Sequence, residues 1–278
     1  MLRSALCAIV LSAVSLNAFA QFESGTLIVL NSSPDEIVVA ADSRAVNAVG
    51  QSDDSCKIAA LGGELVFASS GKSALVSDQA SLAWDSHVVA RNLFLRLSAR
   101  RTKQPMPMRL ALAWGKKVEE KMQSEIRRDP KGILLGAEDN TLITALFAGF
   151  DHNAPFFVTG TVTYETEGGV PTRARFSITG VKKSGSAELG KVEIAHELFG
   201  QHTERARQWF SNLQKEMYVT DDGIAAAAIS AVKMTIDHYP AVQLGNRMVK
   251  VVGGPIDAVK LTPQGIQWIQ RKPNCPKD

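Results

Sequence analysis

Two hydrophobic runs near the start of the chain are apolar along almost their whole length. Residues 26–30 and 36–41 consist mostly of apolar and β-branched residues, and the turn-forming cluster 31–35 (Asn-Ser-Ser-Pro-Asp) separates them. Two such runs around a turn predict a β-hairpin. Because neither run alternates between apolar and polar positions, we expect both faces of these strands to be covered by other parts of the protein.

The pattern beyond this hairpin alternates strands with pairs of helices. We expect further strands over residues 57–61, 64–69, 142–150, 155–164, 174–181, 256–261 and 266–269. Apolar residues at helical spacing predict helices over residues 73–101, 108–126, 203–217 and 221–238. The stretch Ser184-Gly185-Ser186 is typical of a loop. Doubly covered strands with paired helices indicate two packed sheets between helical layers. Since no linker or repeat divides the chain, we expect one α+β domain.

The first twenty residues have the pattern of an export signal. Arg3 precedes an apolar stretch over residues 5–16, and Ala18-Phe19-Ala20 forms a small-residue cleavage site. The stretch is too short to span a bilayer, and no later segment is long and apolar enough to do so. Cys7 lies inside the apolar stretch and not at the cleavage point, which argues against a lipoprotein. We therefore expect the mature chain to begin near Gln21, in the periplasm or secreted.

Composition and charge exclude some classes of partner. The formal net charge is +3, and removal of Arg3 with the signal leaves +2, without the clustered basic face that nucleic-acid binding requires. Cys56 and Cys275 are the cysteines that remain after export. An oxidising compartment permits them to pair, but the sequence leaves open whether they approach one another.

The sequence does not meet the requirements of three common kinds of site: a P-loop, a zincin metal site and a serine elbow. Gly71-Lys72-Ser73 lies between a strand and a helix, but a P-loop requires a glycine five residues earlier, where Val66 stands. His196 and His202 are six residues apart, roughly 240° around a helix, so they cannot share the face that a zincin site needs. A G-x-S-x-G serine elbow is absent. We expect no bound metal and no cofactor.

The threonine that opens the first hairpin, Thr26, is a candidate catalytic residue. A threonine hydroxyl is a weak nucleophile that needs an adjacent base. If the bond before Thr26 is cut, its own α-amine becomes that base, since the ordinary pKa of such an amine is about 7.7–8.0. Gly25 gives the backbone the freedom that attack of the hydroxyl on the preceding carbonyl requires. The pattern predicts a second cleavage, between Gly25 and Thr26.

Such a site also needs a cation, a carboxylate and a donor for the oxyanion. Asp42 ends the strand that pairs with the one after Thr26, and Lys57 opens the second hairpin. An antiparallel first hairpin would bring Asp42 and Lys57 beside Thr26. Gly71 ends the second hairpin, where a bare backbone N–H would face a substrate carbonyl. These residues form the candidate catalytic set.

This set resembles the proteasome β-subunit family of N-terminal-nucleophile (Ntn) hydrolases. The resemblance rests on Gly25-Thr26, on residues 38–44 (Val-Val-Ala-Ala-Asp-Ser-Arg), on Cys56-Lys57-Ile58 and on Ser69-Ser70-Gly71. The spacings from Thr26 to Asp42 and from Lys57 to Gly71 match the family, with one residue fewer between Asp42 and Lys57. The resemblance implies a four-layer αββα sandwich and a peptide or amide substrate. It also implies a homo-oligomer.

The resemblance also implies a role for each residue. Thr26 is the nucleophile, Asp42 and Lys57 are its electrostatic partners, Arg44 organises the site, and Gly71 is the oxyanion donor. Asp237 matches a supporting aspartate. The chain departs from the family at two supporting serines: Val252-Gly253-Gly254 replaces a Ser-Gly-Gly, and the other serine has no clear counterpart.

These expectations divide the chain and leave the substrate open. Residues 1–20 form the signal, residues 21–25 a short propeptide, and residues 26–278 a single domain. The expected activity is that of a threonine-type endopeptidase. A small-molecule amidase or acylase with the same mechanism is one alternative. A non-catalytic binding or assembly protein that retains the fold is the other.

Overall fold

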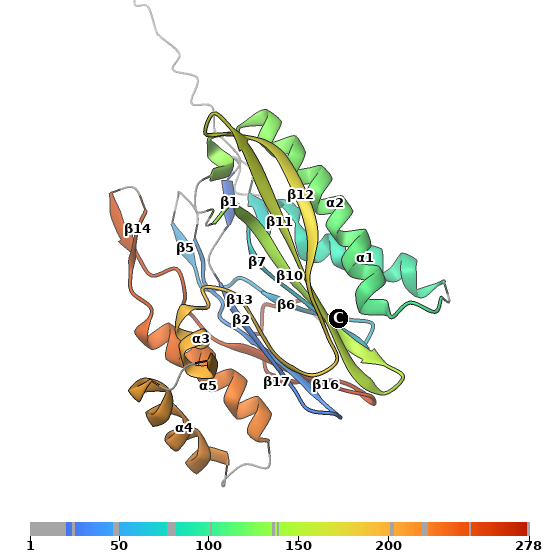
Figure 1. Cartoon of the computed structure of the whole chain (residues 1–278), viewed down its shortest axis with the longest axis vertical. Coiled ribbons are helices and arrows are strands. Elements are labelled where there is room, and N and C mark those ends of the chain that lie inside the picture. The colour runs from blue at the N-terminus through green and yellow to red at the C-terminus, as the bar shows by residue number, and fades with distance from the viewer. Residues whose placement is uncertain are drawn as a thin grey trace, which may run out of the picture.

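A computed structural model of the protein describes residues 21–23, 26–46, 50–76, 82–100, 102–134, 137, 139–200, 203–217, 222–244 and 246–276 (Figure 1). The predicted signal therefore lies outside the described residues, as do Ser24 and Gly25, the last two residues of the predicted propeptide.

The first hairpin lies at the centre of one antiparallel sheet of five strands. This sheet runs in the order β13 (Gly185–Gly190), β2 (Leu27–Ser32), β3 (Ile37–Ala41), β16 (Asp257–Thr262) and β17 (Gly265–Gln270). Ile28 pairs with Ala41 across β2 and β3. The predicted hairpin is confirmed, and the two central strands are buried on both faces, as their uniform apolar pattern indicates.

The second hairpin belongs to another five-stranded antiparallel sheet. Its order is β12 (Val170–Lys182), β11 (Ala154–Glu167), β10 (Thr141–Asp151), β7 (Leu65–Gly71) and β6 (Ile58–Leu61). The predicted strands over residues 142–150, 155–164 and 174–181 are confirmed and are longer at their ends. Gly71 at the end of β7 pairs with Ile143 of β10.

The two sheets face one another, and helices cover their outer sides. Alternate side chains of β2, β3, β7 and β10 form one apolar cluster between the sheets, including Ile28, Val39, Ala68 and Leu146. Helices α1 (Ser86–Ser98) and α2 (Met106–Arg128) pack on the second sheet. Helices α3 (Glu193–Gly200), α4 (Glu204–Met217) and α5 (Gly223–His238) gather beside the first sheet (Figure 1).

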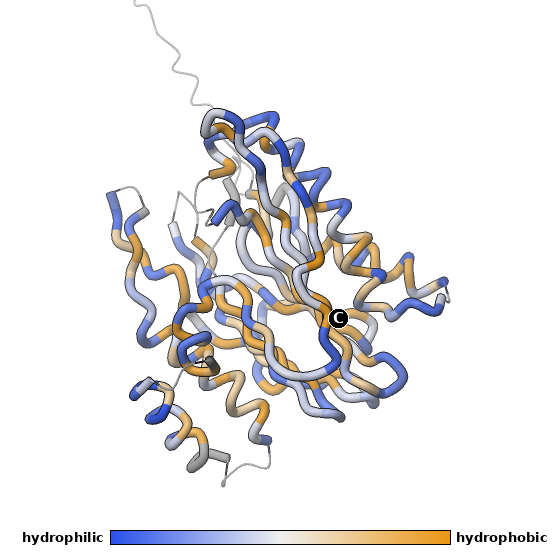
Figure 2. The backbone as a smooth tube through the Cα atoms, in the orientation of Figure 1, coloured by the Kyte–Doolittle hydropathy of each residue, from blue (hydrophilic) through white to orange (hydrophobic). Residues whose placement is uncertain are grey.

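The distribution of hydropathy follows these layers. Hydrophobic residues concentrate along the strands and on the helix faces turned toward the sheets, while hydrophilic residues gather at the hairpin ends and in the connection between α1 and α2 (Figure 2). Trp114 of α2 is fully buried against Phe67 and Phe147 of the second sheet. No described helix is long and apolar enough to cross a membrane.

Three small sheets and a short helix complete the described structure. β1 (Gln21–Glu23), β8 (Ala74–Val76) and β9 (Leu82–Asp85) form one sheet, β4 (Ala45–Val46) pairs with β5 (Gln51–Ser52), and β14 (Val242–Leu244) pairs with β15 (Arg247–Val249). A single 3₁₀ turn, η1, covers Gly132–Leu134. β1 lies at an edge of its sheet, where Phe22 pairs with Leu75.

Two sequence expectations were wrong. The helix predicted over residues 73–101 begins only at Ser86, because β8 and β9 occupy the first part of that range and pair with one another. The helix starts where the side chain of Asp85 caps it by accepting a hydrogen bond of 2.6 Å from the backbone N–H of His87. Of the stretch expected to be a loop, Gly185 and Ser186 belong to β13 and pair with Ser32 and Asn31 of β2.

Candidate active site

Thr26 directly precedes β2, on the side of that strand that lies between the two sheets. Its side chain is fully buried, and its backbone carbonyl accepts a hydrogen bond of 2.9 Å from the N–H of Lys191. Its Oγ1 is the one buried side-chain nitrogen or oxygen within the described ranges that has no hydrogen-bond partner. Native proteins satisfy nearly all such atoms, so an exception requires a particular explanation.

Asp42 comes next to Thr26 through the register of the first hairpin. Its carboxylate accepts hydrogen bonds from the backbone N–H groups of Leu27 at 2.8 Å, Gly253 at 2.9 Å and Arg44 at 3.2 Å. The side chain is fully buried. Burial raises the pKa of Asp42 to about 6, against the lowering effect of the Lys57 charge and of these three hydrogen bonds.

Lys57 is a fully buried cation at the start of the second hairpin. Its charge acts on Asp42 strongly enough to be the largest influence opposing the rise of the Asp42 pKa. The Nε2–H of His87 donates a hydrogen bond of 3.0 Å to the backbone carbonyl of Lys57. His87 is itself held by Asp85, at 3.1 Å from Nδ1. The structure therefore brings Thr26, Asp42 and Lys57 together from three separate strand ends.

Arg44 supports this group from its edge. Its guanidinium forms a two-pronged ion pair with Asp53, with N–O distances of 2.6 and 2.7 Å. That hydrogen-bonded pairing raises the pKa of Arg44 and lowers the pKa of Asp53. The guanidinium lies against Gly253, where an added Cβ would be 2.5 Å from the Arg44 Cζ. Because Gly253 also donates its N–H to Asp42, Arg44 contacts the site through Gly253 and through its own backbone N–H.

Gly71 lies at the end of β7 in a conformation that favours glycine. Its φ is +92°, and an added Cβ would be 2.5 Å from the carbonyl oxygen of Leu142. The next residue, Lys72, uses its N–H to bond that same carbonyl at 2.8 Å. The backbone therefore stays in contact with β10 through Lys72, and Gly71 occupies a position that a larger residue could not take without displacing Leu142.

Asp237 does not join the other predicted residues. Its carboxylate is exposed on α5 and forms an ion pair of 2.7 Å with Lys233, one helical turn earlier. The buried polar residue of that part of α5 is Thr235, whose hydroxyl bonds the carbonyl of Ala231 at 2.9 Å. The supporting role implied by the resemblance therefore has no counterpart in the placement of the Asp237 side chain.

The end of β13 and the residue that follows it also contact Thr26, although neither was among the predicted site residues. Gly190 packs so closely on Thr26 that an added Cβ would overlap the Thr26 carbonyl, and it would lie 2.5 Å from the Ser70 Oγ. Burial lowers the pKa of the Lys191 ammonium, while Glu193 raises it. Gly190 has a φ of +89°. A glycine followed by a lysine, just before a helical pattern, was the available signal, but only the pairing of β13 with β2 reveals its place.

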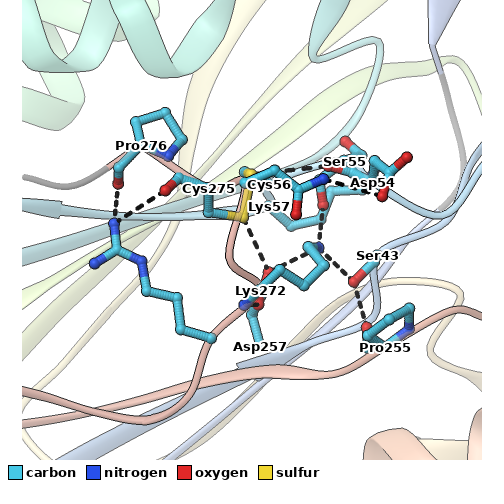
Figure 3. The surroundings of a disulfide bond; sticks show 12 residues. Ser43, Asp54, Ser55, Cys56, Lys57, Pro255, Asp257, Lys272, Cys275 and Pro276 are labelled. Carbon is cyan, nitrogen blue, oxygen red and sulfur yellow. Dashed lines mark hydrogen bonds and ion pairs between the residues drawn. A yellow bond between two sulfur atoms is a disulfide. The ribbon is translucent and has the colours of Figure 1, made fainter.

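A disulfide lies next to Lys57 in the candidate site. Cys56 and Cys275 are bonded, although 219 positions separate them. Beside them, the buried ammonium of Lys272 forms an ion pair of 2.9 Å with Asp257 and bonds the hydroxyl of Ser43 (Figure 3). The pairing that the sequence left open is present, and it fixes the residue that precedes Lys57.

Comparison with known proteins adds no assignment. No protein-family profile matches the chain, and no curated protein matches it. Within the described ranges, no three His, Cys, Asp or Glu side chains cluster in a way that would hold a metal ion.

Proposed function

We propose that this chain is an exported N-terminal-nucleophile hydrolase of the proteasome β-subunit type, activated by cleavage between Gly25 and Thr26. The proposal includes the expected αββα fold, to which the two facing sheets and their outer helices lend support. Its residues are Thr26 as nucleophile, Asp42 and Lys57 as charged partners and Gly71 as oxyanion donor. Arg44 acts at the periphery, and Asp237 has no part in it.

The observation that carries the proposal is the unpartnered hydroxyl of Thr26. A buried donor or acceptor left without a partner costs about 1–3 kcal/mol, and here it lies among three strand ends that also bury an aspartate and a lysine. A structural threonine at this position would be expected to bond a backbone carbonyl, as Thr235 does. A hydroxyl kept free for attack explains the cost.

The two proposed reactions, cleavage of the chain before Thr26 and hydrolysis of a substrate, use different bases. In the first, the Thr26 Oγ attacks the carbonyl carbon of Gly25, the amide nitrogen leaves as the new α-amine, and water hydrolyses the resulting ester. Before this cut the nitrogen of Thr26 is an amide and cannot accept a proton. Asp42, whose pKa is about 6, and Lys57 are the ionisable groups placed to assist. After the cut, the free α-amine takes over as base toward substrates.

The residues before the cut favour an extended peptide over a small amide as substrate. β1 pairs in antiparallel register with β8 through Gln21, Phe22 and Glu23. These residues lie on the acyl side of the bond that would be cut. Their departure would free the edge of β8 for another extended chain on the same side of Thr26, which is the usual way that sheet edges bind peptides.

The disulfide supports the proposed location outside the cytoplasm. Disulfides persist in oxidising compartments such as the periplasm and the extracellular space. The Cys56–Cys275 bond joins the segment before β6 to the segment after β17, in keeping with an export signal over residues 1–20.

A substrate panel with matched variants tests the proposed activity. The purified mature protein is incubated with chromogenic peptide amides and with small N-acyl amides, and a β-lactone acylating agent is used as a probe. We expect hydrolysis of peptide amides and one β-lactone adduct, located on Thr26, both absent in Thr26→Ala. Hydrolysis of small amides alone would replace the peptidase with an amidase. Absence of both hydrolysis and adduct in mature protein would contradict the enzyme and leave a binding protein.

A further inference from the structure

The segment after β17 contacts the two segments that carry Asp42 and Lys57, which we call the two arms of the candidate site. The ammonium of Lys272 bonds the hydroxyl of Ser43, the residue after Asp42, and the carbonyl of Ser55, two residues before Lys57, at 2.7 Å for the latter (Figure 3). Three residues further on, Cys275 is bonded to Cys56, which immediately precedes Lys57. One short segment, residues 272–275, thus contacts the strand ends that carry the aspartate and the lysine. We call it the C-terminal clamp.

The bonds of the clamp leave little freedom. A lysine ammonium has three donors, and Lys272 has three acceptors: the Ser43 hydroxyl, the Ser55 carbonyl and the Asp257 carboxylate. The side chains of Lys272 and Asp257 are only 6% and 2% exposed. A buried ion pair contributes little net stability but strongly disfavours alternative arrangements in which one charge is left alone.

The clamp continues into the hydrogen bonds of Asp42. The Ser43 hydroxyl donates to the carbonyl of Pro255, and the Ser43 N–H bonds the carbonyl of Gly253 at 3.1 Å. Gly253 in turn donates its N–H to Asp42. The Ser55 N–H bonds the carbonyl of Ser43 at 3.2 Å, which ties the two arms directly. Displacement of residues 272–275 would therefore change the positions of both Asp42 and Lys57.

We propose that Lys272 and the Cys56–Cys275 disulfide are positioning elements that hold Asp42 and Lys57 in register, so that reduction of the disulfide lowers the reactivity of Thr26 without unfolding the domain. The inference rests on the proposed roles of Asp42 and Lys57. It makes that function depend on the redox state of the protein, because Asp42 and Lys57 are held in place only while the disulfide is formed.

The reduction is an ordinary exchange with a dithiol. Cys56 is partly exposed and Cys275 is buried, so a dithiol thiolate attacks the Sγ of Cys56 and releases Cys275 as a thiolate. The second thiol of the reductant then displaces Cys56. The protein gains two electrons and two protons and ends with two thiols, while the dithiol becomes a disulfide.

Hydrogen exchange tests the positioning independently of any activity. The Thr26→Val chain, which cannot cut itself, is compared in its oxidised form and after dithiothreitol. We expect at least tenfold faster exchange in the peptides that contain the amides of Ser43, Ser55 and Lys272, and no change in the centre of β10 and β11. Unchanged exchange at the three amides, or faster exchange across the whole domain, would overturn the proposal.

Maturation of the wild-type chain gives the second measurement. We expect cleavage before Thr26 to slow at least tenfold on reduction and to recover on reoxidation, while the Cys56→Ser/Cys275→Ser variant cuts slowly with or without dithiol. Equal rates in the oxidised and reduced forms would overturn the positioning role. If the wild-type chain never cuts in either state, the proposed function fails, while hydrogen exchange still decides whether the clamp orders the two arms.

A paired substitution separates Lys272 from the disulfide. Lys272→Met alone would leave Asp257 buried without its partner and risks misfolding, so it is combined with Asp257→Asn. We expect this variant to keep the disulfide and to mature several-fold more slowly. Because burial is the largest influence on the Asp42 pKa, a looser site should also move the pH midpoint of maturation toward acid. An unaltered rate and midpoint would contradict a positioning role for Lys272.

Discussion

The backbone N–H of Leu27 donates a hydrogen bond of 2.8 Å to the carboxylate of Asp42. Leu27 is the residue that follows Thr26, so this bond fixes the carboxylate one residue from the proposed nucleophile. The charge of Lys57 lowers the pKa of the same carboxylate. This relationship couples the position of the Thr26 backbone to the ionisation of a buried group.

Replacement of Thr26 by valine should stabilise the uncut protein while abolishing the cut. Valine has the same shape and puts a methyl group where an unpartnered hydroxyl lies, so we expect the free energy of unfolding to rise by about 1 kcal/mol. Urea denaturation measures it. The matched control is Thr235→Val, which removes a hydroxyl that bonds Ala231 and should lower stability by a similar amount. A destabilised Thr26→Val would mean that the hydroxyl has a partner in solution.

Asp42 should make both stability and maturation depend on pH. Its pKa is about 6 in the folded state against an ordinary 3.8, so the folded protein binds a proton that the unfolded chain has lost between these values. The contribution of Asp42 to stability is therefore fully present below about pH 4 and is lost as pH rises through about 6. Maturation, which needs the ionised carboxylate, should rise through the same midpoint. Quenched time courses from pH 4.5 to 8, read as intact mass, measure it, and a flat profile would exclude Asp42.

Removal of the Lys57 charge should move that midpoint upward. Lys57 lowers the pKa of Asp42 against the effect of burial, so Lys57→Met should raise the midpoint above 6 and slow the cut at neutral pH by at least a hundredfold. Lys72→Met is the control: Lys72 is also buried, and burial lowers its pKa to about 8, but it is not among the influences on Asp42. A shift of equal size in both variants would contradict a specific pairing of Lys57 with Asp42.

A methyl group at Gly190 should disable the site locally. An added Cβ would overlap the Thr26 carbonyl, and the φ of +89° disfavours any other residue. We expect Gly190→Ala to displace Thr26, break its bond to the Lys191 N–H and slow maturation at least tenfold, at a stability cost of about 1–3 kcal/mol. Gly50→Ala, where an added Cβ meets nothing within 4 Å, should leave the rate unchanged. Equal rates in both variants would show that the contact with Gly190 is dispensable.

The parts of the fold that the sequence predicted are those with local signals. The hairpin of residues 26–41 follows from two uniform apolar runs around a turn, and its antiparallel register alone brings Asp42 beside Leu27. The helix over residues 73–101 was mispredicted because Leu75 and Leu82 fit helical spacing. In the structure they belong to β8 and β9, strands whose pairing with one another and with β1 outweighs that local preference.

The parts that the sequence could not predict depend on contacts between distant segments. Lys272 reads as an ordinary lysine near a terminus, and its burial against Asp257 and Ser43 appears only once β17 has returned to the start of β16. Gly190 reads as a loop glycine until β13 pairs with β2. Asp237 shows the opposite case, in which a motif position on a correctly predicted helix has its side chain turned to solvent.

The intact mass of the exported protein tests the central claim most directly. After export and a long incubation in oxidising buffer at pH 8, the account predicts a chain that begins at Thr26, whereas Thr26→Val should remain at Gln21. Thr26→Ser, which keeps a hydroxyl, should reach the same cut more slowly. A wild-type chain that still begins at Gln21, with the disulfide between Cys56 and Cys275 intact, would contradict the account.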